Sequence, residues 1–180
     1  KLAAGLILSG DFEVGQEKIE AALERDPMSE RANLLLVTAH MGQQNYDAAL
    51  QAIDEFEEKS SESVNADNMR GGVYLQAGKD AEAREAFSRV IAKSPGDLAA
   101  NHNLARLALQ SNDLDLARSH YSNVLEYHEN HLVTLVNLAR LSEREGDLEG
   151  MVAYLEQAIA AHPDALRPRI ILARYYLLSI

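Results

Sequence analysis

The pentapeptide NLARL occurs at 103–107 and again at 137–141, an interval of 34 residues. A weaker copy, ILARY, begins at 171, after the same interval. A constant interval between copies is typical of repeat proteins, in which each copy folds into one small unit and packs against the next. This period constrains the fold more than any other feature of the chain.

The same interval divides the whole sequence without insertion or deletion. The units fall at about 1–29, 30–63, 64–97, 98–131 and 132–165, followed by a partial unit at 166–180. Because the first and last units are incomplete, we expect this single array to be an excerpt of a longer chain.

Each unit contains two blocks in which apolar residues recur at helical spacing. Between the blocks, at position 15 of the unit, stand residues that mostly tolerate the left-handed conformation at a helix end: Gly10, Gln44, Gly78, Asn112 and Gly146. An oxygen-bearing side chain that can cap the next helix follows in four units: Asp11, Asn45, Asp113 and Asp147. Each unit is therefore predicted to be a helix, a tight turn and a second helix.

The columns of the repeat carry a family resemblance. Leu followed by a small residue at positions 7 and 8, Gly near 15, Ala at 20, an apolar residue at 24 and Pro at 32 resemble the tetratricopeptide repeat. The chain departs from that pattern because it has no Trp, because Ser61 and Glu129 replace Pro, and because Phe56 stands where a small residue is usual. The resemblance implies an all-α fold, a right-handed α-solenoid of about five hairpins plus a terminal half hairpin.

A narrower resemblance concerns AIAAHPDALRPRIILARYYL at 158–177 and the segment at 71–97. Both are similar to the large repeat-rich lipoprotein of bacterial exosortase (PEP-CTERM) systems. That similarity implies a role in protein sorting linked to the envelope and to exopolysaccharide. It also implies a periplasmic or outer-membrane-anchored location, with the cytoplasm as the alternative.

Composition excludes several classes of function. The formal net charge of −11 argues against a nucleic-acid binder, which needs a cationic surface. The chain has no Cys, and no apolar run approaches the length that spans a membrane. The HENH segment at 128–131 lacks the i, i+4 histidine spacing of a zinc helix. No phosphate loop or nucleophile motif occurs, so we expect a non-catalytic protein without metal or cofactor.

The candidate site comes from two columns of the first helices, which in the resembled family line a concave groove. Position 9 holds Arg in the last three units, and Arg binds carboxylates through a bidentate fork. Position 6 holds Asn in two units, where an amide can bond to a peptide main chain. The predicted peptide-binding residues are Arg106, Arg140, Arg174, Asn103 and Asn137, bordered by His102 and Arg144. The alternative is that Arg140 pairs locally with Glu143 while the other arginines extend into solvent.

The function predicted first is a protein–protein interaction scaffold whose groove binds a peptide or protein segment with an acidic side chain or a C-terminal carboxylate. The alternative is a structural spacer or assembly element of an envelope complex, with no peptide ligand. Carbohydrate handling is a third hypothesis, but the sequence shows no platform of exposed aromatic residues beside carboxylates. The apolar last element at 166–180 further predicts end-to-end pairing of copies.

Overall fold

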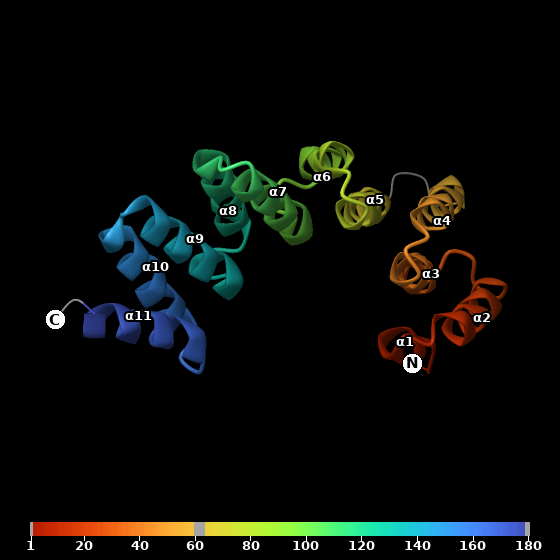
Figure 1. The fold of residues 1–180 in the computed structure, drawn as a ribbon, viewed down its shortest axis with the longest axis horizontal. Helices are drawn as coiled ribbons and strands as arrows, with labels where there is room; N and C mark the ends of the chain where they lie inside the picture. The colour runs from red at the N-terminus through yellow and green to blue at the C-terminus, as the bar shows by residue number, and fades with distance from the viewer. Residues whose placement is uncertain (1, 60–63, 179–180) are drawn as a thin grey trace. The chain divides into compact units, whose positions relative to one another are not determined.

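The computed structural model describes residues 2–59 and 64–178, and every regular element within them is an α-helix (Figure 1). The chain forms two compact units, residues 1–93 and 94–180. The first unit contains α1 (Leu2–Ser9), α2 (Phe12–Leu23), α3 (Glu30–Gly42), α4 (Tyr46–Lys59), α5 (Val64–Gln76) and α6 (Asp80–Lys93). The second contains α7 (Leu98–Gln110), α8 (Leu114–Tyr127), α9 (Leu132–Glu145), α10 (Leu148–Ala161) and α11 (Leu166–Leu178). The predicted all-α fold class is confirmed.

The helices pack as consecutive antiparallel hairpins. In the first unit α1 packs on α2, α3 on α4 and α5 on α6, and α2 and α4 each contact the first helix of the next hairpin. In the second unit α7 packs on α8 and α9 on α10, while α8 contacts α9 and α10 contacts α11. None of the described helices is long and apolar enough to cross a bilayer.

The turn inside each hairpin has the predicted left-handed residue. Positive φ angles occur at Gly10, Gln44, Gly78, Asn112 and Gly146. Asn45, Asp113 and Asp147 then accept hydrogen bonds from the backbone N–H groups three residues later, as a helix cap does. The prediction fails at Asp11, which accepts a hydrogen bond from Ser9 Oγ at 2.9 Å instead of capping α2.

Small residues allow the helices of a hairpin to approach closely. A Cβ atom added to Gly71 on α5 would lie 2.5 Å from the ring of Phe87 on α6. Phe87 and Phe56 are both fully buried, and burying such a side chain contributes about 1.5–3 kcal/mol. Phe56, which departs from the family pattern, packs with Met69 and Val73 in the core of α4 and α5. Ser61, another departure, lies outside the described residues.

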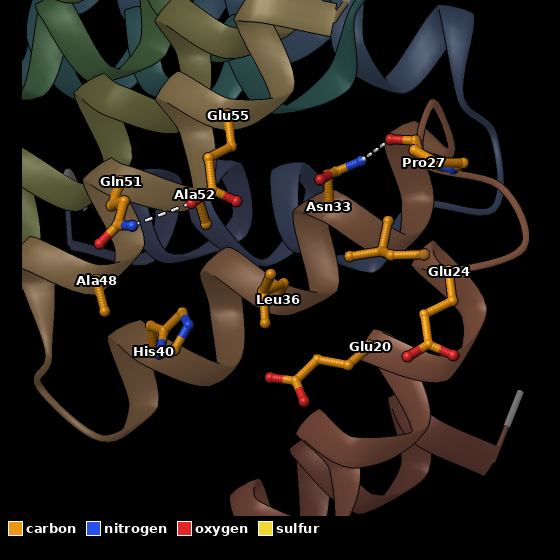
Figure 2. A pocket seen from close by; sticks show the side chains of 11 residues that line it. Glu20, Glu24, Pro27, Asn33, Leu36, His40, Ala48, Gln51, Ala52 and Glu55 are labelled. Carbon is orange, nitrogen blue, oxygen red and sulfur yellow. Dashed lines mark hydrogen bonds between the residues drawn. The ribbon is translucent and has the colours of Figure 1, made fainter.

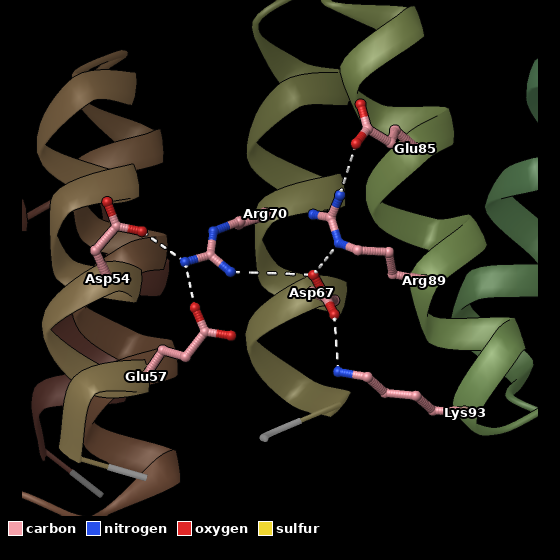
Figure 3. A network of polar contacts seen from close by, with 7 residues as sticks. All are labelled: Asp54, Glu57, Asp67, Arg70, Glu85, Arg89 and Lys93. Atoms are coloured by element: carbon pink, nitrogen blue, oxygen red, sulfur yellow. Dashed lines mark hydrogen bonds and ion pairs between the residues drawn. The ribbon is translucent and has the colours of Figure 1, made fainter. Parts of the chain in front are cut away.

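The Leu column at position 7 is interrupted by Arg70 on α5, and a polar network replaces the apolar contact (Figure 3). Arg70 Nη2 donates to Asp54 Oδ1 at 2.6 Å and to Glu57 Oε2 at 2.7 Å on α4. On the other side, the buried carboxylate of Asp67 accepts from Arg89 Nε at 2.8 Å and contacts Lys93 Nζ at 3.5 Å. These ion pairs join α4, α5 and α6.

Candidate functional site

The first helices of the second unit, α7, α9 and α11, are connected by side-chain contacts. His102 Nε2 on α7 lies 2.8 Å from Thr134 Oγ1 on α9. Glu143 Oε1 on α9 lies 3.6 Å from Arg174 Nη2 on α11. The helix α9 therefore lies beside both of the others. We call the side that carries repeat positions 6 and 9 the first-helix face; its residues are Asn103, Arg106, Asn137, Arg140, Ile171 and Arg174.

The three predicted arginines are all exposed, but they differ in their contacts. Arg174 pairs with Glu143. Neither Arg106 nor Arg140 forms a hydrogen bond or ion pair with any residue that the structure describes. Among the described residues Glu143 pairs with Arg174 on the next helix rather than with Arg140. Arg106 extends into solvent, as the alternative expects. Two guanidinium groups remain available to an external anion.

The two predicted asparagines lie one helical turn before these arginines. Asn103 and Asn137 are half-buried, and their amides hydrogen-bond to no described residue. Residues three apart share a helix face, so each asparagine neighbours the arginine of its own helix. The same polar pair thus occurs on α7 and on α9, with each amide able to donate and to accept a hydrogen bond.

Two residues predicted to border the site form contacts with other residues of the chain. Arg144 donates a hydrogen bond to Asn112 Oδ1 in the turn between α7 and α8. His102 is half-buried, with its ring edge-to-face against Tyr121 at 5.4 Å and against His131 at 5.5 Å. Both side chains therefore have partners within the chain, unlike Arg106 and Arg140 among the described residues.

The contacts of His102 form a small buried polar cluster. The hydroxyl of Thr134 is fully buried and lies 2.7 Å from His131 Nδ1 as well as 2.8 Å from His102 Nε2. One hydroxyl donates a single proton, so one neutral ring accepts it while the other ring donates an N–H. Burial lowers the pKa of His102, and His131 acts in the same direction. Burial also lowers the pKa of His131, together with His128 and His162.

The charges of the second unit are segregated between its elements. Residues 94–180 carry more acids than bases, yet the first helices carry mostly arginine. Their charged residues are Arg106, Arg140, Glu143, Arg144, Glu145, Arg167, Arg169 and Arg174. The acidic residues lie mainly in the turns and on α8 and α10. Electrostatics at α7, α9 and α11 therefore favours an anionic ligand.

The first unit contains a cavity that the sequence analysis did not predict (Figure 2). It lies between α2, α3 and α4, with a volume of about 500 Å³. Its lining includes the carboxylates of Glu20, Glu24 and Glu55 and the imidazole of His40. Within the part of the chain that the structure describes, no group of three ligating side chains could hold a metal ion.

Comparison of the sequence with models of known protein families identifies the family of this chain. A tetratricopeptide-repeat model matches residues 6–54 and 34–97, and a second one matches 74–121. The chain belongs to the tetratricopeptide-repeat family. Proteins of this family generally mediate protein–protein interactions as non-catalytic scaffolds, through the extended surface that stacked repeats form. A model of the TT21 fifth ARM repeats domain, another helical repeat, matches residues 98–170.

Solved structures with the same fold support this tetratricopeptide-repeat assignment. MamA is 18% identical, with 91% of this chain and 95% of that chain covered and a TM-score of 0.67. A thermophilic tetratricopeptide-repeat protein of Thermus thermophilus, TTC0263, is 16% identical, with 98% and 96% covered and a TM-score of 0.69. YrrB, described as having an unusual peptide-binding site, is 19% identical, with 95% and 88% covered and a TM-score of 0.62. At these identities the likeness establishes the shared solenoid fold alone. No curated protein matches the chain.

Proposed function

We propose that the first-helix face of the second unit binds an acidic segment of a partner protein. The observation that carries this proposal is a repeated pair of side chains that form no hydrogen bond or ion pair with the described residues. The pair is Asn103 with Arg106 on α7 and Asn137 with Arg140 on α9. A side chain without an internal partner can bind a ligand without first breaking a hydrogen bond or an ion pair within the protein.

The two residue types have different tasks in this proposal. Each free guanidinium of Arg106 and Arg140 binds a carboxylate oxygen pair, which fixes the register of an acidic peptide. The amides of Asn103 and Asn137 bond to the peptide main chain, which supplies affinity that is independent of sequence. The ligand is therefore an extended segment with carboxylates spaced to meet successive repeats.

The test is fluorescence anisotropy with labelled acidic peptides and a matched set in which Gln and Asn replace Glu and Asp. We expect the acidic set to bind, and Arg106→Ala with Arg140→Ala to weaken binding by about tenfold or more. Arg25→Ala, which removes an exposed positive charge from the first unit, serves as the control. Equal binding of neutral and acidic peptides, or equal affinity of the double variant, would contradict the proposal.

We also propose that the ligand segment belongs to a protein of the bacterial envelope and that it includes a C-terminal carboxylate. The support is the similarity of 71–97 and 158–177 to the exosortase-associated lipoprotein. Peptides that differ only in a free or amidated C-terminus test the carboxylate. Fractionation of cells that produce the full-length protein tests the compartment, and recovery in the cytosol alone would contradict an envelope role.

A spacer or assembly role is the second candidate, and the exposed apolar face of α11 favours it. Leu166, Ile170 and Leu177 are 71%, 65% and 74% exposed. Contiguous apolar surface of this kind is typical of a face that another segment or subunit covers. Sedimentation over a range of concentrations tests pairing between copies, since a constant monomer mass would exclude it.

A further inference from the structure

The first unit also contains an apolar groove whose lining includes two cationic side chains. The groove opens between α1, α2 and α3 and has a volume of about 330 Å³. Its apolar lining is Leu2, Ala3, Ile19, Ala22, Ala32 and Leu35. Lys18 and Arg31 also line it, and no carboxylate among the described residues does. We call this opening the α1–α3 groove.

The following repeat fills the equivalent space with a phenyl ring of its own. Addition of the 34-residue interval to positions 3, 18, 19, 22, 32 and 35 gives Val37, Ala52, Ile53, Phe56, Ala66 and Met69. These six residues are all buried and form part of one core cluster of α3, α4 and α5. Phe56 in that cluster is 1% exposed, whereas Ala22 at the equivalent position of α2 is exposed. The α1–α3 groove therefore lies where the next repeat places an aromatic side chain.

The other second helices also carry a larger side chain here, either at the position of Ala22 or one helical turn before it. These side chains are Phe56 on α4, Val90 on α6, Val124 on α8 and Tyr154 on α10. The two valines are fully buried, and the tyrosine packs against the apolar cluster around Leu155. Among the described second helices, α2 alone has lysine and alanine at the two positions. It supplies no bulky apolar group to fill the space.

The two cations of the groove have no acidic partner within the described chain. Lys18 and Arg31 are exposed, and neither forms a hydrogen bond or an ion pair with a residue that the structure describes. Residues 1–93 carry more acids than bases, so acidic side chains are not scarce in this unit. A carboxylate of a ligand would supply the partner that both cations lack.

We propose that the α1–α3 groove binds a phenylalanine side chain of a partner protein together with a carboxylate next to that phenylalanine. The ring packs on Ile19, Ala22 and Leu35, as Phe56 packs on the equivalent residues of the next repeat. The carboxylate lies beside Lys18 and Arg31, and the guanidinium offers it a bidentate fork. An aromatic ring is favoured over a long aliphatic chain because the chain's own repeat places a ring at this position.

This site goes beyond the proposed function, because it lies in the first unit and requires an apolar anchor as well as an anion. The two proposals fail independently. Loss of acidic-peptide binding at the first-helix face says nothing about the α1–α3 groove, and a groove that binds no phenylalanine leaves the first-helix face untouched.

The test uses N-acetyl-phenylalanine as the probe, because its carboxylate adjoins its ring. N-acetyl-phenylalanine amide lacks the charge and N-acetyl-alanine lacks the ring, so these two are the control ligands. Nuclear magnetic resonance of the isotope-labelled full-length protein follows the methyl groups of Ile19, Ala22 and Leu35. We expect saturable shifts with the probe and about tenfold weaker binding of each control ligand.

Two variants separate the ring from the charge. Ala22→Phe supplies the ring from the chain itself and should weaken the probe by about tenfold or more, because the space is then filled. Ala21→Phe is its matched control, since Ala21 is exposed on the same helix and does not line the groove. Lys18→Gln with Arg31→Gln should weaken the probe by about tenfold and leave the amide ligand unchanged.

Equal binding of the probe and N-acetyl-alanine would overturn the proposal, as would undiminished binding to Ala22→Phe. The absence of saturable shifts in the full-length protein would also overturn it, because another part of the chain would then cover the groove. Peptides that contain phenylalanine beside glutamate identify the kind of ligand. Tighter binding of such a peptide than of the probe supports a protein partner, and weaker binding of every such peptide contradicts one.

Discussion

Glu143 on α9 pairs with Arg174 on α11 across 3.6 Å. This contact neutralises one of the three arginines in the repeated column and leaves Arg106 and Arg140 without a carboxylate partner among the described residues. The number of guanidinium groups available to a ligand is therefore set by an acid on a neighbouring helix. A count of arginines in the sequence does not give that number.

Removal of this carboxylate should strengthen the binding of an acidic ligand. Glu143→Gln frees Arg174 and removes a negative charge from the face, so affinity for an acidic peptide should rise by about twofold to threefold. Both partners are largely exposed, so the free energy of unfolding should change by less than about 1 kcal/mol. Anisotropy titrations at low and high salt measure the first effect. Unchanged affinity at low salt would contradict it.

Two neighbouring glycines on α5 should respond oppositely to alanine. Gly71→Ala places a methyl group 2.5 Å from the Phe87 ring and should destabilise the chain by about 1–3 kcal/mol. Gly72→Ala meets no atom within 4 Å and should stabilise α5 by about 0.5–1 kcal/mol through helix propensity. Chemical denaturation measures both. Equal shifts of the midpoint for the two variants would contradict the packing described for α5 and α6.

Replacement of Arg70 by leucine should destabilise the chain less than replacement by alanine. Arg70→Ala removes the partner of Asp54 and Glu57 and leaves a cavity, and should cost about 2–4 kcal/mol. Arg70→Leu restores the residue that occupies this column in the other repeats, so it should cost less. The denaturant midpoints of the two variants measure these costs. If leucine destabilises as much as alanine, the ion pairs rather than the packing dominate at this position.

The stability of the second unit should fall as the pH drops below the ordinary histidine value of 6.5. Burial lowers the folded-state pKa of His102 and His131, so the unfolded chain binds protons first on acidification. The stabilisation from the two neutral imidazoles is complete above pH 6.5. It is lost as the pH falls from 6.5 to the lowered folded-state pKa values. His102→Gln should flatten the dependence below pH 6.5, measured by denaturation at each pH. An unchanged slope in His102→Gln would contradict the cluster.

Much of the fold could be predicted because it depends on local residue types at fixed spacing. The interval of 34 residues located every hairpin turn, and all five position-15 residues adopt the left-handed conformation. Asp11 shows the limit of this reasoning, because its carboxylate accepts a hydrogen bond from the Ser9 hydroxyl and does not cap the helix.

The candidate site could be predicted only in part, because its availability depends on contacts between repeats. The columns identified Arg106 and Arg140 as exposed candidates. They did not show that Arg144 reaches Asn112 one repeat earlier or that His102 packs against Tyr121. The cavity beside His40 was missed, because its lining comes from three helices and depends on how the hairpins pack.

The central claim is that unbonded polar groups on α7 and α9 receive the ligand. The most direct measurement is the perturbation of the side-chain amide resonances of Asn103 and Asn137 and of the Nε resonances of Arg106 and Arg140 during titration with an acidic peptide. We predict that these four groups shift together and saturate with one affinity. Saturation with the largest shifts on α8 and α10, and none at these four groups, would contradict the account.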